Sequence, residues 1–461
     1  MQRRGRTDVN QPLIRSRAIA GAIAMALACA SASAQTVWFV DDSASPNGNG
    51  LSWSQAFDDL HDALNAAQSG DSIWVAEGRY TPHNHATNPR ASTFNIPGNV
   101  YLYGGFAGVE TSLAQRAGAF ERTLLDGDVG QVGERSDNCF HVVKMRGDTV
   151  PVESELNGFV ICNGNAIGSG GGVGKGGGVS LDLGAGNSWG PSLRLVDCTL
   201  RDNLANKGAA VSALNLSHIK LKNSRVHDNH ATDAGGGLYL ATSALTSVNV
   251  EWARNSALVD GGGAMFFTST AAIQTLVQNN VFRDNRASRG GAVKLHATDV
   301  TKGDAHFECC TFAFNSASRG GAIYVEQAFG AKPVLELYNS ILWRNVASVG
   351  SQIRGSGQFV DVQYCDVQGG FAGEGVLAAD PRFVDAAKRD LRISPGSPAA
   401  DAGKTSLIGP DAMDLDGDSL LYERLPFDFE NRPRFADDPA APNLGVPAPG
   451  QPVVDLGAFE S

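Results

Sequence analysis

Apolar and polar residues recur along this chain in a pattern whose period is 26 to 30 residues from Asn203 onward. The most regular unit is an apolar residue followed three positions later by asparagine; these asparagines are Asn163, Asn203, Asn229, Asn255, Asn285, Asn315 and Asn345. Six positions before each asparagine lies a second column: Asn157, Asp197, Asn223, Asn249, Asn279, Cys309 and Asn339. Glycines follow, and then segments such as Val293, Lys294 and Leu295, in which apolar and polar residues alternate. Alternation with a period of two predicts β-strands that have one buried face.

This repeat is too short for two helices with their turns, and it suits three short strands and three turns in each coil of a solenoid. Asparagine tolerates the left-handed backbone of tight turns. Because neighbouring coils lie about 4.8 Å apart, Asn285 and Asn315 are expected to stack and to bond each other through their side-chain amides. Parallel crossovers are nearly always right-handed. We therefore predict an all-β fold: a single right-handed parallel β-helix with a short N-terminal capping helix and an irregular C-terminal cap.

The two ends of the chain depart from the repeat. Residues 1–34 carry five arginines and then a small-residue apolar run that ends in Ala32, Ser33 and Ala34, which predicts a cleavable secretory signal. Residues 35–75 are expected to form a strand and a helix capped by Ser54, residues 76–379 the coils, and residues 380–461 the C-terminal cap. No other segment approaches about 20 consecutive apolar residues, so we expect a secreted monomer without a transmembrane anchor.

Composition narrows the class of partner. The net charge of −11 argues against nucleic acid, because binding phosphates requires a basic surface. The cysteines beyond residue 34 lack the paired spacing of a zinc site. Cys198, Cys310 and Cys365 take the same position on coils that are not adjacent, so we predict buried free thiols rather than disulfides.

Three stretches resemble known families. The segments from Phe312 to Asn315 and from Gly320 to Ile323 resemble the repeats of chlamydial-type polymorphic outer membrane proteins. The opening, from Val40 to Ile73, is similar to the entrance of pectin-lyase-like β-helices, and the tail from Asp380 to Glu460 resembles the choice-of-anchor Q domain of secreted bacterial proteins. These resemblances imply a β-helix located outside the cytoplasm, released or loosely held at the cell surface.

Enzymes of this fold act on polysaccharides with side chains on an outer face. Lyases need a cation and a base, and hydrolases need two carboxylates. The sequence contains neither the calcium and arginine motifs of pectate lyases nor the aspartate motifs of polygalacturonases. Aligning the coils by their glycines reveals one outward column instead: Ser180, Ser212, Tyr239, Phe266, Lys294, Tyr324 and Arg354.

This column supplies the candidate site. Aromatic rings can stack on sugars and basic groups can hold an anionic sugar, so the ligand-binding candidates are Tyr239, Phe266, Lys294, Tyr324 and Arg354. Coil stacking is expected to bring Lys294, His296, Tyr324 and Glu326 into one patch, and these four are the catalytic candidates if the protein is an enzyme. Aromatic and polar stacking is also ordinary packing on the outside of a β-helix.

One acidic segment suits a metal ion. Asp414, Asp416 and Asp418 alternate around Gly417, an oxygen-rich spacing that calcium favours, and Glu423 lies near in sequence. The alternative is a solvated acidic loop. No other cofactor is indicated.

Two functions stay open. The first is a secreted or surface-associated β-helix that contacts extracellular polysaccharides or a cell surface without catalysis. The second is a polysaccharide-degrading enzyme, a pectate-lyase-like lyase rather than a glycoside hydrolase. The lack of a complete catalytic set favours the first. A groove across the face of Lys294 and Tyr324, walled by the glycine-rich insert between Asn163 and Asn203, would favour the second.

Overall fold

In the computed structural model, the described residues are 35–461 without residue 86 and the segments 117–119, 169–173, 270–274, 298–303, 328–333, 356–358 and 438–440. The expected signal, residues 1–34, and part of the glycine-rich insert lie outside the described residues. From Thr36 to Ser461 the chain forms one unit. None of the helices in the described part is long and apolar enough to cross a lipid bilayer.

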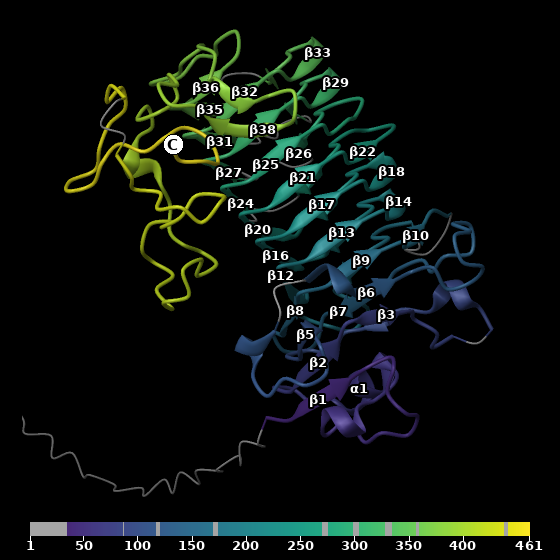
Figure 1. Ribbon diagram of the computed structural model, residues 1–461. Helices are drawn as coiled ribbons and strands as arrows, with labels where there is room; N and C mark the ends of the chain where they lie inside the picture. Colours follow the sequence, from purple (N-terminus) through teal and green to yellow (C-terminus); the bar gives the residue numbers. More distant parts are fainter. Residues whose placement is uncertain are drawn as a thin grey trace, which may run out of the picture. The chain divides into compact units, whose positions relative to one another are not determined.

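Strands from successive coils pair in parallel and build three long sheets, which together make a right-handed parallel β-helix, as predicted (Figure 1). The first sheet contains β1 (Val37–Val40), β2 (Ser72–Ala76), β5 (Tyr101–Phe106), β8 (Glu153–Asn157), β12 (Ser192–Val196), β16 (His218–Lys222), β20 (Ala244–Val248), β24 (Thr275–Gln278), β27 (Asp304–Glu308), β31 (Val334–Tyr338) and β35 (Val360–Gln363). The second sheet contains β3 (Gly78–Tyr80), β6 (Thr123–Asp126), β9 (Val160–Cys162), β13 (Thr199–Arg201), β17 (Arg225–His227), β21 (Glu251–Ala253), β25 (Val281–Arg283), β28 (Thr311–Ala313), β32 (Ile341–Trp343) and β36 (Asp366–Val367).

The third sheet contains β4 (Phe94–Asn95), β7 (Val143–Arg146), β11 (Val179–Asp182), β15 (Val211–Leu214), β19 (Leu238–Ala241), β23 (Met265–Ser269), β26 (Val293–Ala297), β30 (Ile323–Gln327) and β34 (Ile353–Arg354). Between the second and third sheets lie two smaller parallel sheets, one of β10 (Asn165–Ala166), β14 (Leu204–Lys207), β18 (His230–Ala234) and β22 (Ser256–Ala257), the other of β29 (Ser316–Arg319) and β33 (Val346–Val349). Each coil therefore passes from the first sheet to the second and then to the third.

Inward side chains of the three sheets fill a continuous core. Aromatic rings stack at the same position of successive coils: the centroids of Phe282 and Phe312 are 4.5 Å apart with nearly parallel planes, and Trp252 lies 6.2 Å from Phe282. All three side chains are fully buried. Removing one buried ring of this kind typically costs about 3–5 kcal/mol, so the stacked column contributes much of the stability of the coils.

The predicted asparagine ladder is present and buried. The side-chain amide of Asn285 donates to Oδ1 of Asn315 at 2.9 Å, and Asn315 donates to Asn345 at the same distance. The same bond joins Asn203 to Asn229, Asn229 to Asn255 and Asn255 to Asn285. Each oxygen also accepts the backbone N–H of the preceding rung, so every rung bonds both to its neighbours and to the turn itself.

Two expectations about this turn are wrong. The left-handed residue is not the ladder asparagine but the residue before it, as at Asp228 (φ 56°) and Arg254 (φ 53°). Asn163 is not a rung, because β9 pairs with β13 in a register that places Ile161 opposite Leu200 and therefore Gly164 opposite Asn203. Asn163 itself takes the left-handed position of the turn, with φ 62°.

The N-terminal helix is shorter than predicted. Helix α1 (Leu60–Ala66) begins after Asp59, whose carboxylate accepts the backbone N–H of His61 at 2.9 Å. Ser54 lies instead in a single 3-10 turn, and Phe57 forms a parallel bridge with Val40. The chain is extended around Phe57 because its ring packs against the end of the core, which a helix starting at Ser54 would not allow.

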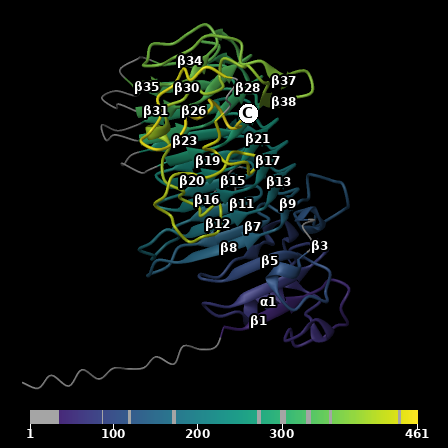
Figure 2. The same ribbon diagram turned by 60° about the vertical axis from the view of Figure 1, so that its left-hand side comes forward.

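The C-terminal segment lies along the flank of the β-helix. After the antiparallel hairpin of β37 (Phe383–Asp385) and β38 (Asp390–Ile393), it runs back beside β31, β27, β24 and β20 (Figures 1 and 2). It covers the turn between the first and second sheets, where the second column of the sequence pattern lies. Asn249 and Asn279 in this column donate side-chain hydrogen bonds to the backbone oxygens of Asp428 and Phe427. Both asparagines have a left-handed backbone that directs their amides toward this segment.

All six cysteines beyond residue 34 are buried free thiols. Cys198 and Cys310 donate to backbone oxygens at 3.2 Å, those of Val196 and Glu308 respectively. Burial raises the pKa of Cys198 to about 12, so the thiol stays protonated at neutral pH. The prediction of single core thiols is therefore confirmed for Cys198, Cys310 and Cys365.

Candidate functional site

The third sheet aligns the predicted column as expected. In the pairing of β26 with β30, Lys294 lies opposite Tyr324 and His296 opposite Glu326. The carboxylate of Glu326 collects three groups: Nζ of Lys294 at 2.8 Å, the guanidinium of Arg289 at 2.8 Å and Nδ1 of His296 at 3.0 Å. The four predicted residues therefore do share one patch, and Arg289 from the preceding turn joins them.

The exposure of this patch was predicted wrongly. Lys294 is fully buried, with its ammonium also bound to Asp260 at 2.6 Å, and Tyr239 is buried as well. The glycine turn passes close to the outward column: at Gly208 (φ 61°) an added Cβ would lie 2.9 Å from Cβ of Tyr239. Turn residues therefore fold over the strands. Tyr324 is half-buried and Arg354 is exposed, while the side chain of Phe266 lies outside the described part of the structure.

The charges of this patch are largely compensated. Partial burial opposes the charged form of Glu326, but the bond from Lys294 and the charge of Arg289 outweigh it and hold the pKa of Glu326 below its usual value. A carboxylate that is kept ionised by three donors is a weak proton acceptor. The arrangement favours a role in holding the turns on the third sheet rather than in proton transfer.

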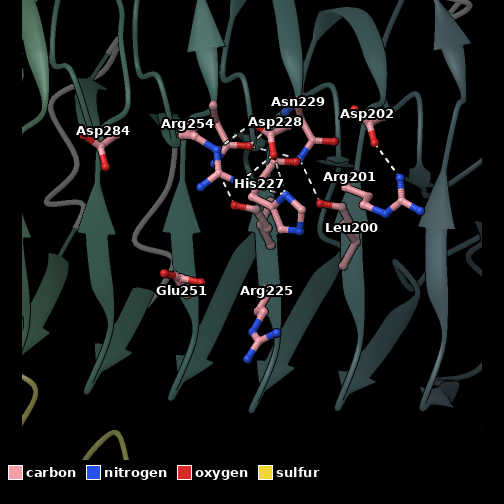
Figure 3. A network of polar contacts seen from close by, with 12 residues as sticks. Leu200, Arg201, Asp202, Arg225, His227, Asp228, Asn229, Glu251, Arg254 and Asp284 are labelled. Carbon is pink, nitrogen blue, oxygen red and sulfur yellow. Dashed lines mark hydrogen bonds and ion pairs between the residues drawn. The ribbon is translucent and has the colours of Figure 1, made fainter. Parts of the chain in front are cut away.

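The second sheet carries a charged face that the sequence analysis missed (Figure 3). The strands are β13, β17, β21 and β25. In each of these four coils, an outward charged residue of the strand and the left-handed turn residue just before the ladder asparagine carry opposite charges. The residues of this charged face are Arg201, Asp202, Arg225, His227, Asp228, Glu251, Arg254, Arg283 and Asp284. Aligning the coils on the residue before each ladder asparagine, rather than on the glycines, would have revealed it.

Ion pairs on this charged face run both within and between coils. Arg254 holds Asp228 of the preceding coil with two hydrogen bonds, of 2.8 and 2.6 Å, and Nδ1 of His227 lies 2.7 Å from the same carboxylate (Figure 3). Arg283 donates to Glu251 of the preceding coil at 2.7 Å. The side chains of Arg254 and Asp228 are 45% and 39% exposed and face solvent, whereas those of Arg283 and Glu251 are only 19% and 21% exposed.

A pocket of about 180 Å³ lies where this charged face meets the C-terminal segment. Its charged lining consists of Glu251, Arg283, Arg389, Asp390, Arg392 and Glu430, and its apolar lining of Val281, Leu391, Phe429 and Phe459. Arg389 binds Asp284 through two nitrogens and stacks on Phe314, with 3.8 Å between guanidinium carbon and ring centroid. The two pocket rings, Phe429 and Phe459, meet edge to face at 5.4 Å.

The first sheet gathers a second set of titratable groups around His306. Its Nε2 lies 2.7 Å from Glu308 and its Nδ1 3.1 Å from Glu336, while Tyr338 donates to Asp361 at 3.0 Å. Burial opposes the charged imidazole, but the two carboxylates outweigh it and raise the pKa of His306. His306, Glu336 and Asp361 are successive members of one column, because β27 pairs with β31 and β31 with β35. The second column of the sequence pattern lies three residues further along each coil than this column. Aligning the coils on that second column would therefore have identified these residues.

The predicted acidic residues also lie together. Carboxylate oxygens of Asp414, Asp416 and Asp418 are within 4.8 Å of one another, and so are those of Asp411, Asp416 and Glu423. Asp411 was not predicted, because it stands outside the alternating spacing around Gly417.

Comparisons with known proteins found similarity only among solved structures. No family model matches the sequence, and no curated protein matches it. Among solved structures, the chain is similar to the pectate lyase Pel9A, with TM-score 0.46, 14% identity, and 93% of this chain and 97% of that chain covered. It is also similar to XylC in complex with xylose, with TM-score 0.36, 9% identity, and coverage of 92% and 98%. Values this low transfer no residue role to this chain.

Proposed function

We propose that this protein is an extracellular β-helix that binds a polysaccharide without catalysis, through the charged face of the second sheet. The observation that carries the proposal is the pocket between β21, β25 and the C-terminal segment, which combines arginine–carboxylate pairs with two aromatic rings. We also propose that the protein is released from the cell or is loosely attached to the cell surface.

The chemistry of the pocket suits a sugar. Sugar hydroxyls both donate and accept hydrogen bonds, and the paired groups offer guanidinium N–H donors beside carboxylate acceptors. Phe429 is partly exposed and adds apolar surface for the C–H face of a sugar ring, and the buried Phe459 packs against it. The lining has three arginines and three carboxylates, so its charges balance and a neutral or weakly acidic sugar fits better than a highly charged one.

Catalysis at this pocket is disfavoured by the state of its ionisable groups. The hydrogen bond from Arg392 lowers the pKa of Asp390, which keeps this carboxylate ionised. Arg283 bonds Glu251, and arginine itself does not give up its proton near neutral pH. The described lining therefore offers groups that hold a ligand rather than groups that move a proton.

The test is binding of the full chain to an array of neutral and acidic polysaccharides. Replacing Arg283 and Arg392 together by Gln should weaken binding about tenfold or more, since each hydrogen bond to a charged group contributes roughly 1.5–3 kcal/mol. The matched control is Arg354→Gln on the exposed part of the third sheet, which should bind like the wild type. Loss of binding in the control and not in the double variant would assign the ligand to Tyr324 and Arg354 instead.

A polysaccharide lyase is the second candidate, and the cluster around His306 favours it. An imidazole whose pKa is raised between two carboxylates, next to the tyrosine Tyr338, is a group that can take part in proton transfer. If it does, the full chain releases unsaturated uronate products that absorb in the ultraviolet, and His306→Ala abolishes the signal. His85→Ala, at an exposed position near the N-terminal end of the described chain, should leave that activity unchanged. If no uronate polymer yields such a product in the presence of divalent cations, the lyase is rejected and only the binding proposal stands.

A further inference from the structure

The acidic residues of the C-terminal segment lie on one closed loop that is docked on the β-helix. The loop spans residues 411–423, and the backbone N–H of Asp411 donates to the carbonyl oxygen of Glu423 at 2.8 Å, which closes it. Just before the loop, Gly409 donates its N–H to the buried carboxylate of Glu308 at 2.9 Å. Inside the loop, the carbonyl oxygen of Met413 accepts a hydrogen bond from Lys222 of β16 at 3.2 Å. The loop is therefore held at both its base and its side.

Five carboxylates crowd into this loop. One oxygen each from Asp411, Asp416 and Glu423 lies within 4.8 Å of the others, and Asp416 also belongs to a second such trio with Asp414 and Asp418. Calcium binds oxygens at about 2.3–2.6 Å, so two oxygens on opposite sides of one ion are about 5 Å apart. Each trio is compact enough for its three oxygens to bind one ion, and Asp416 belongs to both trios.

Two carboxylate oxygens of this loop are buried without a hydrogen-bond partner in the described part of the chain. Asp411 is fully buried, and its Oδ2 accepts the N–H of Leu415 at 2.6 Å. Its Oδ1 has no hydrogen-bond partner among the described residues, and neither does the buried Oε1 of Glu423. Burying a carboxylate oxygen without a donor is unfavourable unless a proton or a cation compensates it.

Protein cations compensate only part of this charge. The ammonium of Lys222 lies beside the loop, yet it is bonded to the carbonyl oxygens of Met413 and Asp414 rather than to a carboxylate. The neighbouring Arg424 donates to Gln451.

We propose that the loop 411–423 binds a calcium ion, with Asp411, Asp416 and Glu423 as its central ligands and Asp414 and Asp418 completing the shell. The oxygen-only donor set and the irregular loop suit calcium, which accepts six to eight oxygens in flexible geometry, better than magnesium, which requires a near-ideal octahedron. The ion orders the loop, and the ordered loop docks on the flank of the β-helix through Lys222 and Glu308. This site is independent of the sugar-binding proposal.

The experiment is calorimetric titration of the chelator-treated full chain with calcium and, separately, with magnesium. We expect calcium binding, and at least a tenfold weaker affinity in both Asp411→Asn and Glu423→Gln. Asp385→Asn, an acidic control in the β37–β38 hairpin, should bind calcium like the wild type. If Asp411→Asn fails to fold, the exposed Asp416→Asn gives the same test at a position that does not support the core.

Three results would overturn the assignment. The first is the absence of a calcium signal up to millimolar concentration, and the second is wild-type affinity in both Asp411→Asn and Glu423→Gln. The third is magnesium binding as tight as calcium binding, because a flexible shell of six to eight oxygens discriminates against the smaller ion.

Discussion

The guanidinium of Arg434 lies 2.8 Å from the carboxylate of Glu460, and both side chains are buried. The same guanidinium donates to Oδ1 of Asn279 at 2.6 Å, a residue 155 positions earlier in the sequence. Two backbone oxygens, those of Gly457 and Ala458, accept its remaining hydrogen bonds. One arginine therefore joins the end of the chain to the turn between the first and second sheets.

Replacing this arginine should loosen the whole C-terminal segment. Arg434→Met leaves Glu460 buried without its cation, which we expect to lower the free energy of unfolding by about 3–5 kcal/mol. Chemical denaturation measures this change. Lys388→Met removes an ion pair on the exposed β37–β38 hairpin and should have little effect. Equal stability of the two variants would show that the buried pair does not hold the segment.

The asparagine ladder makes a second prediction about stability. Asn315→Leu removes the acceptor for the backbone N–H and the amide of Asn285, and the donor to Asn345. Leaving such buried groups unpaired costs about 1–3 kcal/mol, so the thermal midpoint should fall. Asn95→Leu, at an exposed position of β4, is the control and should melt like the wild type. An unchanged midpoint for Asn315→Leu would argue against an energetic role for the ladder.

Stability should also fall in weakly acidic solution because of His141. Its imidazole is buried, with Nδ1 2.8 Å from the carbonyl oxygen of Gly176, and burial lowers its pKa to about 4. The unfolded chain takes up this proton near pH 6.5, so the stabilising contribution is complete above that pH. It is lost as the pH falls toward 4, by about 3 kcal/mol at most. In urea denaturation at several pH values, His141→Gln should lose less stability than the wild type between pH 6.5 and 4. Identical pH profiles would contradict this assignment.

The free cysteines predict a simple labelling pattern. Because all six are buried and burial raises their pKa values, a thiol reagent should label almost none of them in the native protein. All six should react once denaturant is added. Mass spectrometry that finds Cys198 and Cys310 bridged would contradict the register of the coils.

The proposed calcium ion predicts a local effect on proteolysis. Chelation should speed cleavage of the segment after Asp401, since the loop 411–423 would lose its central ion, while the β-helix coils stay resistant. In Asp411→Asn the rate should be high with and without chelator. Identical digestion of the wild-type protein under both conditions would mean that the ion does not fasten the segment.

Much of the architecture could be predicted from local pattern. The period of the asparagines, together with the alternation at Val293 and Leu295, determined the stacked coils and the ladder, because these depend on contacts that repeat from one coil to the next. The prediction that the cysteines are not bridged was correct for the same reason, because it also depends on the spacing between coils. The prediction for Asn163 was wrong because the coil length changes there. Asn163 still follows an apolar residue by three positions, but the strand register is shifted by one residue, so Gly164 takes the ladder position.

The candidate sites depended on tertiary structure. Sequence alternation put Lys294 on the outer face, but it did not reveal that its side chain is buried and that Asp260 and Glu326 bind its ammonium. The pocket on the second sheet exists only because Arg389 and Phe429, more than 100 residues further along, are brought against β25 by the C-terminal segment. The sequence by itself determined which residues repeat at each coil position, since the spacing between coils is a property of the backbone. Only the tertiary structure decided which of those positions face solvent, because burial is set by distant segments whose contacts leave no periodic signal.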